Sequence, residues 1–290
     1  GNSADVVTAL GKITNTGNAN IKLDDAHDLT QLVSISSATS GSITLNTDAV
    51  ALTGSADNLK TALDKITNYS GSVTINNVKD DEIPVATIRA IYTQTKNNPT
   101  IQNKITIVGS LPNLKHALNA VTHNNANIYV NNTHDVDILK DVNNLTTGSI
   151  RLLDITRPLT GKTNDLVQAL DGQVDYQGEL TLITDGGSAV EISATDINKL
   201  TSIATKAPRF MEPHTLIGKS TDVKLALENT IGDPRIDVEL QDNHTLAELK
   251  SINKNTQGNI SLNRSLSLEG STADLKTALS GLTYFGSITI

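Results

Sequence analysis

The chain has no cysteine and no tryptophan in its 290 residues. Without thiols it has no disulfide, no thiolate nucleophile and no cysteine-ligated zinc or iron–sulfur site. Aromatic residues make up only 2% of the chain, although hydrophobic residues of all types reach 37%. The interior must therefore be built from Leu, Ile, Val and Ala. Such side chains suit many thin, similar layers better than one thick core.

Positive charge is also scarce: 23 Lys and Arg stand against 31 Asp and Glu, which gives a net charge of −8. Phosphate backbones and anionic lipids need a basic surface, and no local cluster of Lys and Arg supplies one. We therefore expect no nucleic-acid partner. We also expect no direct membrane insertion, because no apolar run approaches the roughly 18 residues of a spanning helix.

What the sequence does contain is a repeat. The pattern Gly-x-x-x-Asx-[Leu/Val]-x-x-Ala-Leu occurs six times, 52 to 57 residues apart, beginning at Gly1, Gly54, Gly109, Gly161, Gly218 and Gly270. Regular repeats of this length indicate a stacked array in which each unit buries its apolar face against its neighbours. We therefore expect residues 1–290 to form a single repeat domain. The chain starts in register with its own repeat and has no signal-peptide pattern, so we expect a segment of a longer protein, partnered by neighbouring domains.

The motif predicts a helix in every copy. After its Asx position, apolar residues recur at i, i+3, i+4 and i+7, as in Leu59, Ala62, Leu63 and Ile66. The Asx residue itself is interpreted as the N-cap, whose side chain accepts backbone N–H groups of the first turn. These predicted caps are Asp5, Asn58, Asn113, Asp165, Asp222 and Asp274.

A second, weaker helical stripe follows in each complete repeat, as in Leu246, Leu249 and Ile252. Residues before four of these stripes are again interpreted as caps, and Thr245 with Glu248 forms a capping box. The four predicted caps are Asp28, Asp135, Asp196 and Thr245.

Short runs with alternating β-branched residues separate the helices and predict strands. They include 20–23, 42–45, 50–52, 72–75, 127–130, 179–182, 259–262, 266–268 and 287–290. Strands that alternate with helices favour a parallel sheet with right-handed crossovers. The predicted fold is an α/β solenoid of strand–helix units, with strands on one face and helices on the other. It is like a leucine-rich repeat in architecture only, because the Leu-x-x-Leu-x-Leu-x-x-Asn signature is missing.

Two kinds of residue could carry a metal. His27, His134 and His244 occupy one phase of the repeat, but they are two repeats apart, about 20 Å at about 4.8 Å per strand. Since metal–nitrogen bonds are about 2 Å long, the three cannot share an ion, and we interpret them as loop and cap residues. Acidic clusters at the turns leave calcium open. The clusters are Asp24, Asp25 and Asp28; Asp80, Asp81 and Glu82; and Asp135 with Asp137. Asp185-Gly186-Gly187 is an isolated turn and not part of a calcium-binding repeat.

No motif for catalysis or phosphate binding occurs, so we predict no catalytic, cofactor-binding or metal-binding residues and no enzyme. The regular repeat is interrupted mainly by insertions at 93–104, with Pro99, and at 206–214. The second insertion gathers Pro208, Arg209, Phe210, Met211 and Pro213. It is either a binding loop or an irregular loop that its own Phe and Met anchor in the core.

The runs Leu52-Thr53-Gly54-Ser55-Ala56-Asp57-Asn58-Leu59 and Leu268-Glu269-Gly270-Ser271-Thr272-Ala273-Asp274-Leu275 resemble tandem repeats of very large bacterial cell-surface proteins. Those proteins include adhesin-like giants of marine cyanobacteria. The resemblance covers the whole chain and implies a structural or adhesive spacer at the cell surface or outside the cell. It transfers no catalytic residue.

Two other functions remain open from the sequence. A recognition solenoid would bind protein or glycan through its strand face or the 206–214 insertion, although five Tyr and six Arg provide few of the usual anchors. An enzyme acting on polysaccharide would need paired carboxylates on adjacent coils.

Overall fold

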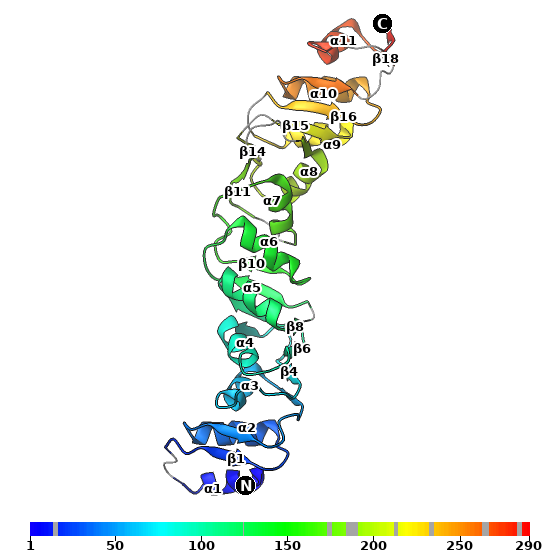
Figure 1. The fold of residues 1–290 in the computed structure, drawn as a ribbon. Helices are drawn as coiled ribbons and strands as arrows, with labels where there is room; N and C mark the ends of the chain where they lie inside the picture. The colour runs from blue at the N-terminus through cyan, green and yellow to red at the C-terminus, as the bar shows by residue number, and fades with distance from the viewer. Residues whose placement is uncertain are drawn as a thin grey trace. The chain divides into compact units, whose positions relative to one another are not determined.

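The computed structural model describes residues 1–13, 17–123, 125–172, 176–183, 191–211, 214–231, 235–262, 267–282 and 286–290. Helices and short strands alternate along these ranges, which makes the fold mixed α/β as expected (Figure 1). The residues group into two compact units. The first unit holds residues 1–134 and 141–153, and the second holds residues 135–140 and 154–290.

Each copy of the motif forms a helix of eight to ten residues. These helices are α1 (Ser3–Leu10), α3 (Ala56–Leu63), α5 (Leu111–Ala120), α7 (Thr163–Leu170), α9 (Ser220–Glu228) and α11 (Thr272–Leu279). In the last five copies the motif's Ala and its first Leu or Val are buried, whereas Ala9 in the first copy is exposed. The motif alanines of α3 and α5, Ala62 and Ala117, are fully buried.

The predicted N-caps of these helices are wrong by three positions. Asp5, Asn58, Asn113, Asp165, Asp222 and Asp274 all lie inside the helices. The cap is the residue after the motif glycine, as at Ser55, whose hydroxyl accepts the N–H of Asn58 (3.3 Å). An Asx in the first turn still lies near the positive end of the helix dipole, which favours a carboxylate there.

The second set of helices is α2 (Leu29–Ala38), α4 (Val85–Tyr92), α6 (Val136–Asn144), α8 (Ala194–Ile203) and α10 (Leu246–Asn255). Asp28 and Thr245 cap their helices through complete capping boxes, and Asp135 accepts the N–H of Ile138 (2.9 Å). The cap predicted at Asp196 is wrong, because α8 begins two residues earlier with Ser193 at the cap.

In the first unit, strands whose paired residues are 21 to 26 positions apart in sequence pair in parallel. We call one such strand-to-strand stretch of the chain a coil. The sheets are β1 (Ile21–Leu23) with β2 (Ile43–Leu45); β3 (Leu52–Gly54), β4 (Val73–Ile75), β6 (Thr100–Ile101) and β8 (Thr122–His123); and β5 (Glu82–Pro84), β7 (Thr106–Gly109), β9 (Asn127–Val130) and β10 (Ile150–Leu152). All of these pairs are parallel, which confirms the predicted strand direction.

The second unit repeats this arrangement. Its sheets are β11 (Leu159–Gly161), β12 (Leu180–Leu182) and β14 (Arg209–Phe210); β13 (Glu191–Ser193), β15 (Thr215–Gly218), β16 (Asp237–Leu240) and β17 (Ile260–Leu262); and β18 (Leu268–Glu269) with β19 (Ile288–Thr289). Strand β11 begins 107 residues after β3, and β17 begins 110 residues after β10. The sheet pattern thus recurs after two copies of the motif rather than one.

The core of each unit lies between its strands and its helices. Inward strand residues such as Ile75 and Ile107 and helix residues such as Leu59 and Leu114 are fully buried. Among the described residues, Tyr69 in the first unit and Tyr176 in the second are the largest fully buried side chains. Burying an aliphatic side chain contributes about 1.5–3 kcal/mol, so these repeated layers account for most of the stabilisation.

Candidate functional site

The three in-phase histidines lie in the core rather than in exposed loops. His27, His134 and His244 are 4%, 2% and 4% exposed. Each one directly precedes the first helical turn of α2, α6 or α10, beside the cap as the sequence predicts. Their role is therefore to fill the turn that leads from a strand into a helix.

Two residues before each of these histidines is an Asx that ties neighbouring coils together. Its side chain accepts the first backbone N–H of the preceding motif helix, a group that a helix leaves without a partner. Three such bonds are Ser3 N–H to Asp25 (2.8 Å), Leu111 N–H to Asn132 (3.2 Å) and Ser220 N–H to Asp242 (2.8 Å). Asn77, which has no histidine two residues after it, accepts the Ala56 N–H in the same way (2.7 Å). A helix is thus capped by a residue 21 or 22 positions further along the chain.

These ties explain why acidic residues recur at the turns. Asp25 is occupied by α1, while Asp24 accepts a hydrogen bond from the Asn46 amide (2.6 Å) and Asp81 from the Asn77 amide (3.3 Å). Within the described ranges, no three His, Asp or Glu side chains are grouped so that they could hold a metal ion. Asp185-Gly186-Gly187 lies outside the described residues.

His27 also belongs to a buried hydrogen-bond chain. Its Nε2 is 3.1 Å from the Tyr69 hydroxyl, which donates to the Val50 carbonyl (2.6 Å). Because the phenol has a single proton, His27 Nε2 must be the donor to Tyr69. Burial lowers the pKa of His27, opposed in part by Asp25, and burial raises the pKa of Tyr69 to about 12. Both side chains are therefore neutral at neutral pH and link two coils without a buried charge.

A second tie between coils went unnoticed in the sequence. In Thr-x-Gly triplets the threonine hydroxyl donates to a carbonyl 20 residues earlier and accepts the glycine N–H two residues later. Thr39 donates to Ala19 (2.6 Å), Thr146 to Ala126 (2.6 Å) and Thr256 to Ile236. The glycine N–H bonds are 3.0, 3.0 and 2.9 Å long. We call this arrangement the hydroxyl clamp.

Tyrosine replaces threonine in the intervening turns. Tyr69 donates to Val50 and Tyr176 to Arg157, each 19 residues earlier. The glycine two residues later is required by contact, since a Cβ at Gly71 would lie 2.0 Å from the Val50 oxygen. The recurrence of Thr-x-Gly at 39, 146 and 256, and of Tyr-x-Gly at 69 and 176, was the sequence signal for the clamp.

The two insertions serve the core in their described parts. Phe210 is only 3% exposed and packs edge-on against His214, with ring centroids 5.3 Å apart. Met211 is 58% exposed, and positions 212 and 213 lie outside the described residues. In the 93–104 insertion, the carbonyl of buried Pro99 accepts the N–H of Thr122 (2.8 Å). The anchored-loop interpretation therefore fits Phe210, whereas Met211 points to solvent.

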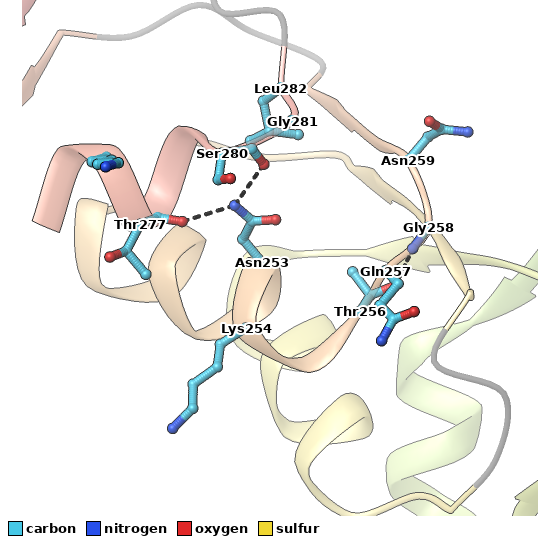
Figure 2. A pocket seen from close by; sticks show the side chains of 11 residues that line it. Asn253, Lys254, Thr256, Gln257, Gly258, Asn259, Thr277, Ser280, Gly281 and Leu282 are labelled. Atoms are coloured by element: carbon cyan, nitrogen blue, oxygen red, sulfur yellow. Dashed lines mark hydrogen bonds between the residues drawn. The ribbon is translucent and has the colours of Figure 1, made fainter.

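A polar groove lies at the carboxyl-terminal ends of α10 and α11 (Figure 2). It has a volume of about 590 Å³, and its lining includes Asn253, Lys254, Thr256, Lys276 and Thr277. The first unit has a groove of about 430 Å³ at the same phase of the repeat. Its lining includes Ser36, Thr39, Lys60 and Thr61, which occupy the positions of Asn253, Thr256, Lys276 and Thr277.

The α10–α11 groove has hydrogen-bonding groups, but its lining side chains include no carboxylate or imidazole to act as a base. The Asn253 amide is already engaged, since it donates to the carbonyls of Thr277 (2.8 Å) and Ser280 (3.0 Å), as Figure 2 shows. The Thr256 hydroxyl is held in its clamp. The groove can therefore accept a polar group but holds no nucleophile paired with a base.

Neither known protein families nor curated proteins match the chain in sequence. Over the ranges that the structure describes, each helix is too short or too polar to cross a membrane.

Proposed function

We propose that the chain is a non-catalytic structural or adhesive segment of a large bacterial surface or secreted protein. It is one α/β solenoid over residues 1–290, built from repeats that start near 1, 54, 109, 161, 218 and 270. The coils stack in one direction, and the segment holds other domains of the same long chain away from the cell.

The observation that carries this proposal is the recurrence of ties between coils. The Asx tie and the hydroxyl clamp return at the same phase in both units, for example at Asp25 and Asp242 and at Thr39 and Thr256. Each tie joins residues 19 to 22 positions apart, which is one coil. A protein selected to keep neighbouring coils in register uses its polar residues in this way.

Lysine–aspartate pairs add further links of the same kind. Lys140 on α6 contacts Asp165 in the first turn of α7 (2.7 Å), and Lys250 on α10 contacts Asp274 in the first turn of α11. Partly exposed pairs of this type contribute about 0.2–1 kcal/mol each, so they align neighbouring helices more than they stabilise the fold.

The second candidate is a recognition solenoid that binds protein or glycan. Met211 is exposed beside the buried Phe210, and its side chain in the 206–214 insertion can contact a protein or glycan partner. This function predicts a concentrated binding surface, whereas the spacer needs none.

Fractionation of the source cells tests the proposal, using an antibody against this segment. A very large band in the outer-surface or secreted fraction is the expected result. A band of about the segment's own 30.7 kDa in the cytoplasm would contradict both the location and the spacer role.

A further inference from the structure

The outer face of one sheet in the first unit carries a row of threonines. The register of β3, β4, β6 and β8 places Thr53, Thr74, Thr100 and Thr122 side by side, one threonine on each strand. Their neighbours Leu52, Val73 and Ile101 point inward and are buried. Thr53, Thr100 and Thr122 are exposed and Thr74 is half-buried, so the threonine row faces solvent.

The positions on either side of this row are uncharged, and all but Ala51 are polar. Two residues before the threonines of β3, β4 and β6 stand Ala51, Ser72 and Asn98, and two residues after them stand Ser55, Asn76 and Gln102. These six residues flank the strands; five of them are exposed and Ser55 is half-buried, so with the four threonines they form a band of ten uncharged residues. We call these ten residues the neutral grid.

The four threonine hydroxyls of the grid are not used by the fold, whereas the Ser55 hydroxyl caps α3 and the Asn76 amide oxygen accepts from Asn103. Within the described part of the chain, the hydroxyls of Thr53, Thr74, Thr100 and Thr122 have no hydrogen-bond partner. The threonines of the hydroxyl clamps, such as Thr146, contrast with them because both of their hydrogen-bonding functions are engaged. The grid therefore presents free donors and acceptors to solvent.

The second unit shows that the architecture does not require this composition. Its equivalent strands β11, β12 and β14 pair in the same register, Thr160 with Thr181 and Thr181 with Arg209. Their outer positions include Lys162, Glu179 and Arg209, all exposed. The same sheet thus forms with a charged outer face, and the neutral grid is a property of the first unit alone among these two equivalent sheets.

We propose that the neutral grid binds an uncharged polysaccharide that lies across the strands. The grid lacks the charge that an ionic partner needs and the apolar area that a hydrophobic partner needs, which leaves a neutral partner rich in hydroxyl groups. Neighbouring strands are about 4.8 Å apart, so a chain of regular repeating units meets a similar set of donors and acceptors at each strand. This binding adds a ligand to the proposed surface role and does not depend on the spacer function being correct.

Binding at each strand is weak, because no aromatic ring belongs to the grid for a sugar to stack on. The attraction accumulates with the number of strands that a single polymer chain crosses. A charge introduced at the centre of the grid therefore disrupts binding in two ways, by removing a hydroxyl and by requiring desolvation of the new carboxylate.

Affinity electrophoresis in native gels tests the proposal with the whole 290-residue chain. The gels contain a soluble neutral polysaccharide (dextran, laminarin, hydroxyethyl cellulose, mannan or galactan) or anionic alginate. The test variant is Thr74→Glu with Thr100→Glu, on adjacent strands of the grid. The matched control is Thr160→Glu with Thr181→Glu, on adjacent strands of the equivalent sheet, which adds the same charge.

The expected result is retardation by at least one neutral polysaccharide, with at least tenfold weaker apparent binding for the grid variant and unchanged binding for the control. Circular dichroism and melting temperature establish that both variants fold. Retardation by none of the five neutral polymers, or by alginate alone, would overturn the proposal. Equal loss in the grid variant and the control would also overturn it, since added charge rather than the grid would then explain the effect. None of these failures bears on the spacer role, which the fractionation tests separately.

Discussion

Replacing Thr146 by valine removes the hydroxyl of one clamp while keeping the size and shape of the side chain. In the folded protein, Thr146 is buried and its hydroxyl satisfies both the Ala126 carbonyl (2.6 Å) and the Gly148 N–H (3.0 Å). Valine can replace neither bond. Both backbone groups would then remain at the joint between two coils without a partner from the chain.

The expected loss follows from the cost of unpaired polar groups. A buried donor or acceptor left unsatisfied costs about 1–3 kcal/mol. With two groups affected and some access for water, we expect Thr146→Val to lower the free energy of unfolding by about 2–4 kcal/mol. The adjacent Thr147→Val is the matched control: that side chain is exposed, and such surface changes usually stay within about 0.5 kcal/mol.

Urea unfolding followed by far-ultraviolet circular dichroism measures both variants, because the chain has no tryptophan to report by fluorescence. The midpoint for Thr146→Val should fall clearly below that of the wild type, with the Thr147→Val midpoint unchanged. Equal midpoints for Thr146→Val and Thr147→Val would refute the argument that the clamp stabilises the joint between coils.

Two further predictions concern acid and the clamp glycine. Burial lowers the pKa of His27 and of His244 below the ordinary value of 6.5, so the unfolded chain binds more protons once the pH falls below that value. The free energy of unfolding should therefore decrease as the pH falls from 6.5 through the lower folded-state pKa values. The melting temperature should be lower at about pH 5 than at about pH 7.5. An equal drop in melting temperature in the wild type and in a His27→Asn, His244→Asn double variant would contradict this. Gly71→Ala should destabilise the fold by more than about 1 kcal/mol, because its Cβ would lie 2.0 Å from a backbone oxygen. Gly11→Ala is the control and should be neutral, since the nearest contact of its Cβ is 3.5 Å. Equal melting temperatures for the two variants would show that the backbone relaxes around position 71.

The parallel sheet could be predicted because it depends on a pattern within each coil. Alternating runs such as 127–130 and the stripe of Leu59, Ala62 and Leu63 record local burial, and they became β9 and α3. Strands of two residues, such as β6 and β8, are too short to show an alternation. These two strands can be identified only from their pairing with neighbouring strands in the structure.

The caps of the motif helices were predicted three positions too late, and at two of these helices the true cap position offers no local acceptor. Lys162 and Lys219 occupy cap positions although lysine has no side-chain oxygen to accept an N–H. At α9 the missing acceptor comes from Asp242, 22 residues after the N–H of Ser220. A partner in the next coil is not visible to a rule that reads only neighbouring residues. The burial of His27, His134 and His244 was likewise not predictable from their neighbours in sequence, because other coils cover these side chains.

The central proposal is a single solenoid over residues 1–290, and it can be tested directly because the chain has no cysteine. Single cysteines at exposed Asn119 on α5 and exposed Thr221 on α9 allow paired spin labels, one in each unit. A pair at Asp57 and Asn119 within the first unit provides the reference width. Pulsed electron–electron double resonance should give a distance distribution between the units as narrow as the reference. A broad or multimodal distribution would show that the units move independently and would contradict a single solenoid.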